Sequence, residues 1–238
     1  MRVSSTEVQN NFGKYLKFAE ANEEIIVTKN GRDIARIVPC APETARESAE
    51  EYRTRGDWVT YEEFMELVEN SEQRFELIDG VVYNLASPSY KHQHAVQELQ
   101  GTFYNWFKGK PCTALTSPFD VTLDKSEFNR CVVQPDLIVI CDRQNVNEKG
   151  RYMGVPTLVV EVLSPSTRSK DMLKKLDLYL QCGIKEYWVV DPAQNLINVY
   201  SFQDGDISDM KTFTSQHRTA DSLHFEGLKV SMEDVFAG

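Results

Sequence analysis

The sequence lacks a long apolar run. None of its 238 residues lies in the roughly 20-residue apolar stretch that a transmembrane helix needs, so we expect no membrane-spanning helix. The first residues, Met1–Ser5, lead into a polar amphipathic segment without the apolar centre of a secretory signal. These absences predict a protein without a membrane contact or a secretory leader.

Closely spaced cysteines are also missing. The five cysteines are scattered along the chain, and no two of them form a Cys-x-x-Cys pair. An odd, scattered set argues against a zinc ribbon and against a disulfide framework, and it is typical of proteins kept in a reducing compartment. We therefore expect a cytoplasmic protein.

The chain lacks the basic excess of most proteins that bind nucleic acid through its phosphates. Its formal net charge is −10. Residues 1–39 hold six basic and five acidic residues, a net of +1, which leaves −11 for the remainder. This acidity argues against tight nonspecific DNA binding, but it does not exclude an active site in which a metal bridges acidic side chains and phosphate.

Residues 1–40 carry the pattern of a small α+β module. Ser4-x-x-Glu7 is a capping-box pattern that starts a helix, and apolar residues then recur at helical spacing as far as Ala19. Asn30-Gly31 is a tight-turn pair between two β-rich segments. The module is therefore predicted to have the order β-α-β-β.

Residues 41–57 are rich in Ala, Glu, Pro and Arg, and we interpret them as a tail or linker, with a helix over residues 43–52 left open. The following domain, residues 58–238, alternates between strand-like and helix-like segments. This alternation predicts an α/β fold in which helices flank a mixed sheet. The predicted helices include residues 94–108 and 171–182, and the predicted strands are residues 74–78, 81–85, 119–123, 132–141, 157–163, 186–190 and 196–202.

Two carboxylates interrupt strands that are otherwise apolar: Asp136 in residues 132–141 and Glu161 in residues 157–163. A carboxylate inside a buried strand is costly unless it is hydrogen-bonded, paired or bound to a cation. Two of them on neighbouring strands suit Mg²⁺, which prefers oxygen ligands, and Mn²⁺ is an alternative. A strand-end cap or a pair with a buried arginine explains Glu161 alone equally well.

The predicted helix at residues 171–182 offers a lysine beside these carboxylates. Its apolar residues define a buried face, and Lys175 lies at the edge of that face next to Tyr179, whereas Lys174 lies opposite. Lys175 can therefore reach back to the sheet, and extension into solvent is its alternative.

Several ordered motifs from Trp58 onward resemble the restriction-endonuclease family of the PD-(D/E)XK nuclease superfamily. They are Gln134-Pro135-Asp136, Val160–Thr167, Asp171-x-x-x-Lys175 and Glu186–Asp191, with Phe75–Gly80 and Pro88-Ser89-x-x-His92 upstream. Leu163 stands where the usual motif has its lysine, and in this family the lysine lies on the following helix, as Lys175 does. The resemblance implies a restriction-endonuclease-like fold and hydrolysis of phosphodiester bonds.

The same resemblance implies roles for individual residues. Asp136 and Glu161 would be the metal ligands, and Lys175 would contact the attacking water or the scissile phosphate. Glu76 is a candidate for a further catalytic carboxylate near the metal, with a surface strand residue as its alternative. His92 either approaches the site or is a satisfied core or helix-end histidine, and we favour the second interpretation.

The first 50 residues resemble the Phd/YefM antitoxin family. Met1–Leu16, Ile25–Arg32 and Ala35–Pro39 carry this resemblance, which implies a module that dimerises and binds operator DNA. By the same analogy Arg2, Gln9, Asn10 and Lys14 would face DNA. A dimerising module that has lost its DNA contact is the alternative, because the net charge of the segment is only +1.

Three functional hypotheses follow. The first is a metal-dependent DNA endonuclease that forms a homodimer or higher homo-oligomer through its N-terminal module. The second is a DNA-binding or partner-binding protein of a toxin–antitoxin-like system that does not cleave. The third adds to the first an N-terminal module that restrains the nuclease domain through an antitoxin-like contact within or between chains.

Overall fold

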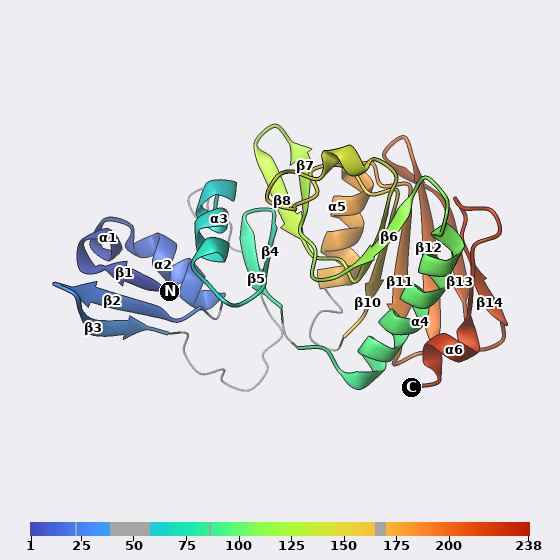
Figure 1. Cartoon of the computed structure of the whole chain (residues 1–238), viewed down its shortest axis with the longest axis horizontal. Helices are drawn as coiled ribbons and strands as arrows, with labels where there is room; N and C mark the ends of the chain where they lie inside the picture. The colour runs from blue at the N-terminus through green and yellow to red at the C-terminus, as the bar shows by residue number, and fades with distance from the viewer. Residues whose placement is uncertain (22, 39–57, 86, 165–169) are drawn as a thin grey trace. The chain divides into compact units, whose positions relative to one another are not determined.

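The computed structural model of the chain describes residues 1–21, 23–38, 58–85, 87–164 and 170–238 (Figure 1). The chain divides into two compact units, Met1–Ala86 with Ser126–Cys131, and Ser87–Lys125 with Val132–Gly238. The predicted linker at residues 41–57, with its optional helix, lies outside the described residues. Residues 58–85 belong to the same unit as the N-terminal module. The domain boundaries taken from the sequence stay a prediction.

The N-terminal module has the predicted β-α-β-β order, except that its helix is divided in two. The elements are β1 (Arg2–Ser4), α1 (Ser5–Asn10), α2 (Phe12–Glu20), β2 (Ile25–Lys29) and β3 (Arg32–Ile37), and the sheet order is β1-β2-β3. Ser4 caps α1 by accepting a hydrogen bond from the backbone N–H of Glu7, as its capping-box pattern predicts. Asn11 separates the helices with φ −131° and ψ 37°, which are not helical values.

The first unit also contains α3 (Tyr61–Glu69), β4 (Phe75–Ile78) and β5 (Val81–Asn84). Thr60 and Glu63 form a complete capping box at the start of α3. The strands β4 and β5 form an antiparallel hairpin. Two further strands, β7 (Val121–Ser126) and β8 (Asn129–Val133), contain parts of the segment Ser126–Cys131 that belongs to this unit.

The second unit is built on a six-stranded mixed sheet of order β13-β12-β11-β10-β9-β6. Within it β10 and β11 are parallel, and the other neighbours are antiparallel. The strands are β6 (Thr113–Thr116), β9 (Leu137–Ile140), β10 (Leu158–Val162), β11 (Glu186–Asp191), β12 (Leu196–Gln203) and β13 (Asp206–Phe213). The other elements are α4 (Tyr90–Phe107), η1 (Arg143–Asn145), η2 (Lys170–Lys175), α5 (Leu176–Gln181), β14 (Thr219–Asp221), β15 (Lys229–Ser231) and α6 (Met232–Phe236).

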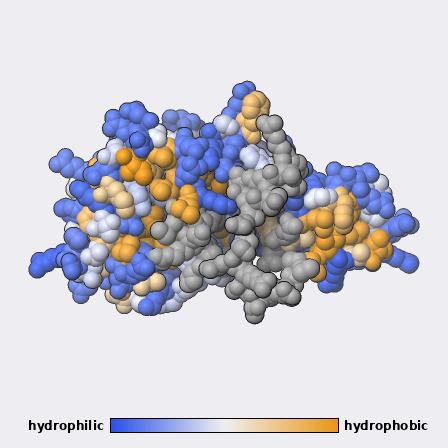
Figure 2. All heavy atoms as spheres, turned by 180° about the vertical axis from the view of Figure 1, so that it is seen from behind, coloured by the Kyte–Doolittle hydropathy of each residue, from blue (hydrophilic) through white to orange (hydrophobic). Residues whose placement is uncertain are grey.

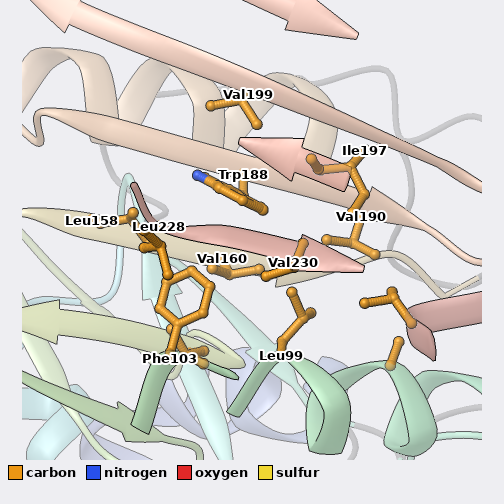
Figure 3. Close-up of a cluster of buried hydrophobic side chains, with 14 of the residues drawn as sticks. Leu99, Phe103, Leu158, Val160, Trp188, Val190, Ile197, Val199, Leu228 and Val230 are labelled. Carbon is orange, nitrogen blue, oxygen red and sulfur yellow. The ribbon is translucent and has the colours of Figure 1, made fainter. Parts of the chain in front are cut away.

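The main hydrophobic core lies on one face of this sheet. Figure 3 shows Leu99 and Phe103 of α4 next to the strands that carry Val160 and Trp188, with Val230 of β15 close by. All five side chains are fully buried. Side chains alternate along a strand, so the residues next to Val160 in β10 and next to Trp188 in β11 face the opposite side of the sheet. The helix α5 packs on that side, where its Tyr179 contacts Glu161 and Tyr187.

One predicted strand is two strands in the structure. Residues 132–141 divide into β8 and β9, and Gln134, Pro135 and Asp136 lie between them. Proline has no backbone N–H to donate to a strand ladder, so a strand tends to end there. The expectation that Asp136 lies in mid-strand is therefore wrong: it directly precedes β9.

The cysteine spacing argued against a disulfide framework, but one disulfide joins Cys112 and Cys141. The β6–β9 ladder pairs Thr113 with Ile140, and its next step places the two cysteines opposite each other. Sheet register brings together cysteines that are 29 residues apart, and sequence spacing alone does not reveal it. The cysteine pattern accordingly gives no support to a reducing compartment. No helix in the described ranges is long and apolar enough to span a membrane.

Candidate active site

Of the two predicted metal ligands, Glu161 lies in β10 and Asp136 directly precedes the adjacent strand β9. The antiparallel ladder between β9 and β10 pairs Leu137 with Val160. Continuing this register by one residue places Asp136 opposite Glu161. Directly opposed residues of an antiparallel pair have their Cβ atoms about 5 Å apart on the same face. The strand register therefore brings the two carboxylates together.

Asp136 is held through a single carboxylate oxygen. The backbone N–H of Val162 donates a hydrogen bond to Oδ2 at 2.8 Å, and Nε2 of His92 lies 3.3 Å from the same oxygen. The side chain of Asp136 remains 19% exposed, whereas His92 is buried. Asp136 is thus fixed to the strand that carries Glu161 and keeps access to solvent.

Glu161 is buried, and two donors meet on one of its oxygens. Lys175 Nζ and Tyr179 Oη both donate hydrogen bonds to Glu161 Oε1, each at 2.7 Å. Glu161 is 3% exposed, Lys175 2% and Tyr179 0%. A buried carboxylate is tolerated when an opposite charge and a hydrogen-bond donor compensate the lost hydration, as they do here.

The helical segment after β10 delivers both donors. It begins as a π-helix, η2, and continues as the α-helix α5 from Leu176. Lys175 and Tyr179 are four residues apart, so they project from the same side of this segment. The helical wheel selected Lys175 over Lys174 on this ground, and the structure places the Lys175 ammonium on Glu161.

A polar network supports the segment that precedes Asp136. Asp120 accepts a hydrogen bond from Gln134 Nε2 at 2.8 Å and another from Arg151 Nε at 3.2 Å. Gln134 is two residues from Asp136, so Asp120 restrains the turn between β8 and β9. Asp120 was not singled out from the sequence, because its partners come from distant parts of the chain.

Glu76 belongs to the first unit, apart from the unit that holds the other three candidates. It lies on β4, where all four residues are buried, and its side chain is 0% exposed. The alternative of a surface strand residue is therefore wrong. Its catalytic role stays a prediction.

The four residues expected to face DNA differ in their surroundings. Gln9 and Asn10 are exposed, and Arg2 is exposed but bonded to Asp33. Lys14 lies 3.2 Å from a carboxylate oxygen of Glu66 and is largely covered. Burial alone would lower the pKa of Lys14, but the hydrogen bonds and charge attraction from Glu66 and Tyr15 together outweigh burial and raise the pKa. Lys14 therefore stays charged while an internal partner occupies it.

Two further residues join the site. The sequence places Tyr179 only among the apolar residues of a helix face, and it favours a helix-end role for His92. In the structure Tyr179 bonds to Glu161, and His92 lies beside Asp136. The i, i+4 spacing from Lys175 to Tyr179 is a signal that could have revealed the tyrosine.

The donor set suits a hard divalent cation. Mg²⁺ is commonly held by one or two carboxylates and several waters, and Asp136 and Glu161 supply two carboxylates. Asp136 is partly exposed, and no described residue contacts its Oδ1. Within the described ranges no group of three or more His, Cys, Asp or Glu residues could hold a metal, so water would complete the coordination.

Family models match both parts of the chain. Residues 61–233 match the Uma2 model, described as "Putative restriction endonuclease". The chain belongs to the Uma2 family. Residues 1–76 match the model of the Phd_YefM antitoxin of type II toxin–antitoxin systems. Both resemblances stated from the sequence are thereby confirmed.

Individual relatives agree with the Uma2 assignment. The "Uncharacterized protein slr1290" of Synechocystis sp. (strain ATCC 27184 / PCC 6803 / Kazusa) is 26% identical over 180 residues, covering 74% of this chain and 90% of that protein. The crystal structure of "a putative nuclease belonging to DUF820" from Anabaena variabilis ATCC 29413 is similar with a TM-score of 0.62. It is 22% identical and covers 75% of this chain and 98% of that chain. This likeness confirms the nuclease-like α/β fold.

Proposed function

We propose that this Uma2 protein is a metal-dependent endonuclease that hydrolyses DNA phosphodiester bonds. One observation carries the proposal: the register of β9 and β10, continued by one residue, brings Asp136 opposite Glu161, and the Lys175 ammonium bonds to Glu161. In a purely structural ion pair the two charges usually satisfy each other. Here a second, partly exposed carboxylate, Asp136, accompanies the buried pair of Glu161 and Lys175. Membership of a restriction-endonuclease family makes phosphodiester hydrolysis the chemistry that this arrangement serves best.

Asp136 and Glu161 would hold Mg²⁺ or Mn²⁺ in this site. Such an ion, when bound, supplies positive charge at the scissile phosphate and lowers the pKa of a coordinated water. The side chain of Asp136, fixed by Val162, stays partly exposed, so a phosphate can approach it. The ammonium of Lys175 orients the attacking water or stabilises the negative charge that develops on the phosphate oxygens.

A plasmid-nicking assay tests the proposal. With Mg²⁺ the wild-type protein should nick supercoiled DNA, and chelation by EDTA should stop the reaction. Asp136→Ala, Glu161→Ala and Lys175→Ala should each lower the rate by roughly 10²–10³-fold, because each removes charge stabilisation of the transition state. Asp209→Ala and Lys185→Ala are matched controls, since both residues are exposed in the same unit.

The result also separates the two classes of function. Equal cleavage by wild type and all three site variants would remove the site assignment. Salt-sensitive DNA binding by a wild-type protein that never cleaves would support the alternative, a DNA-binding protein of a toxin–antitoxin-like system.

We further propose that the N-terminal module forms a homodimer. Figure 2 shows apolar surface gathered on this small module, and Phe12, Leu16 and Ile34 are 40–54% exposed. Exposed apolar side chains in such a small module favour a protein partner, and a second copy is the simplest one. Light scattering should give twice the chain mass for wild type and the mass of one chain for Phe12→Glu/Ile34→Glu. A wild-type monomer at micromolar concentration would contradict the dimer.

A further inference from the structure

Both site carboxylates share a feature that the proposed roles do not require. On each, two groups meet at one oxygen: the Val162 N–H donates to Asp136 Oδ2 with His92 Nε2 3.3 Å from the same oxygen, and Lys175 and Tyr179 both donate to Glu161 Oε1. We infer that His92 and Tyr179 are the positioning residues of the active site. They orient the two carboxylates toward the metal and do not themselves contact the ion or the substrate.

Geometry at Asp136 explains why a second contact matters. The Val162 N–H belongs to a strand, so its position is fixed, but one hydrogen bond still allows the carboxylate plane to turn about it. His92 restrains that rotation from α4, a different element. The helix presents His92 in its first turn because Ser89 caps its start by accepting a hydrogen bond from the His92 N–H. The helix start thus sets the orientation of a carboxylate on the sheet.

At Glu161 the second donor has a further consequence. In the proposed function Lys175 also serves the water or phosphate, so its ammonium cannot be committed to Glu161 throughout. Tyr179 donates to the same oxygen from a fully buried position, and its ring packs edge-on against Tyr187 at 5.0 Å. Tyr179 therefore keeps Glu161 oriented when the ammonium moves. A tyrosine held on its ring side is well suited to this, because only its hydroxyl is polar.

This inference rests on the proposed metal site, and metal binding without DNA tests it. Outer residues that orient metal ligands typically contribute 10–100-fold to metal affinity. Tyr179→Phe removes one hydroxyl and keeps the ring, and His92→Leu removes the ring nitrogens. His92→Gln is the conservative variant, since its amide nitrogen can still donate at a position near that of Nε2.

Tyr152→Phe is the matched control. Tyr152 is also fully buried in the second unit and also donates its hydroxyl to a carboxylate, Asp142, at 2.5 Å. Tyr152→Phe, like Tyr179→Phe, removes one buried hydroxyl that donates to a carboxylate, but the carboxylate is a different one. Thermal melting followed by circular dichroism identifies the temperature at which every variant is folded.

Calorimetric titration of the full-length chain with Mn²⁺ is the main measurement. Tyr179→Phe and His92→Leu should weaken Mn²⁺ binding by about 10–100-fold, and His92→Gln should recover part of the loss. Tyr152→Phe should bind Mn²⁺ as the wild type does. In cleavage assays at saturating DNA, the two weakened variants should need more Mn²⁺ to reach half of their maximal rate, with little change in the KM for DNA.

The outcomes distinguish this inference from the proposed function. Folded Tyr179→Phe and His92→Leu proteins that bind Mn²⁺ with wild-type affinity would overturn the positioning role, whether or not DNA is cleaved. A wild-type protein that binds Mn²⁺ but never cleaves DNA would contradict the proposed function alone. A wild-type protein that binds no Mn²⁺ would overturn both.

Discussion

Glu161 and Glu186 are buried glutamates on neighbouring strands, yet their surroundings differ. Glu161 accepts hydrogen bonds from two side chains, Lys175 and Tyr179. Glu186 accepts hydrogen bonds from the Trp188 indole, the Ser222 hydroxyl and the backbone N–H groups of Leu223 and His224. All of these donors are uncharged. Burial of a carboxylate is therefore not, by itself, a sign of catalysis.

The two glutamates also face opposite sides of the sheet. Glu186 lies on the face of Trp188, where the main core is, and it ties the turn before β15 to β11. Glu161 lies on the face covered by α5, next to Asp136. A carboxylate enclosed by backbone donors is an anchor with one stable arrangement. A carboxylate held by a lysine and a tyrosine has side-chain partners that can move away from it. The proposed hydrolysis requires this of Lys175, which also serves the water or the phosphate.

The largest expected effect separates the two glutamates by activity. Glu161→Gln should lower the single-turnover rate of DNA nicking by roughly 10²–10³-fold, because a neutral amide neither holds the metal nor pairs with Lys175. Glu186→Gln, measured where both proteins are folded, should keep the wild-type rate. Equal rate losses in the two variants would erase the distinction between site and anchor.

Substitution of Glu186 should affect the stability of the protein, although it leaves the cleavage rate unchanged. Glu186→Ala leaves the Trp188 indole and the N–H groups of Leu223 and His224 without their acceptor. Each buried donor left unsatisfied costs about 1–3 kcal/mol, so we expect a loss of about 3 kcal/mol in the free energy of unfolding. Urea denaturation measures it, with exposed Glu226→Ala as the control. A loss under about 1 kcal/mol would mean that Glu186 is not an anchor.

Removing the whole polar group at Glu161 sharpens the contrast. The triple variant Glu161→Leu/Lys175→Met/Tyr179→Phe replaces all three buried polar groups with apolar ones. Apolar replacement of a buried ion pair is often neutral or stabilising by about 1–4 kcal/mol, so we expect no loss of stability and no nicking. Lys175→Met alone should destabilise, because Glu161 loses its counter-charge. A triple variant less stable than that single variant would show that the cluster is mainly structural.

The smallest effect belongs to an exposed pair, Asp221 and Lys229, whose side chains are 38% and 54% exposed. Burial raises the pKa of Asp221, but the hydrogen bonds from Lys229 and Thr219, together with the positive charges of Lys229 and Lys211, outweigh burial and lower the pKa overall. The contribution of Asp221 to the free energy of unfolding is therefore fully present above the pKa that Asp221 has in the unfolded chain. This contribution is lost as the pH falls through the lower pKa that Asp221 has in the folded protein. Asp221→Asn should cost less than about 1 kcal/mol at pH 7 and nothing in strong acid, by urea denaturation at both pH values.

Much of the fold could be predicted, because local patterns mark its elements. The Ser4 cap and the capping box at Thr60 start α1 and α3, and Asn30-Gly31 turns β2 into β3. Short or polar elements gave no such signal: β6, β13 and the β14–β15 hairpin were not predicted. In β13 seven of eight residues are exposed, so it lacks the alternating pattern by which a strand is recognised.

The candidate site could be predicted in part. Asp136, Glu161 and Lys175 were selected because charged residues in apolar surroundings need a reason. His92 and Tyr179 were not selected, because a histidine near a helix start and a tyrosine on an apolar helix face fit ordinary structural roles. Only the register between β9 and β10 and the packing of α5 show which carboxylate each of them meets.

The sequence by itself determined the family, the alternating strands and helices, and the three charged groups of the site, since these depend on residue types and spacings along the chain. Tertiary structure alone decided which oxygen each donor binds, why Glu186 is an anchor and Glu161 is not, and that Cys112 meets Cys141. Those facts depend on strand register and on which helix covers which face. Such long-range arrangements are selected by the packing of the whole unit, and no local segment encodes them.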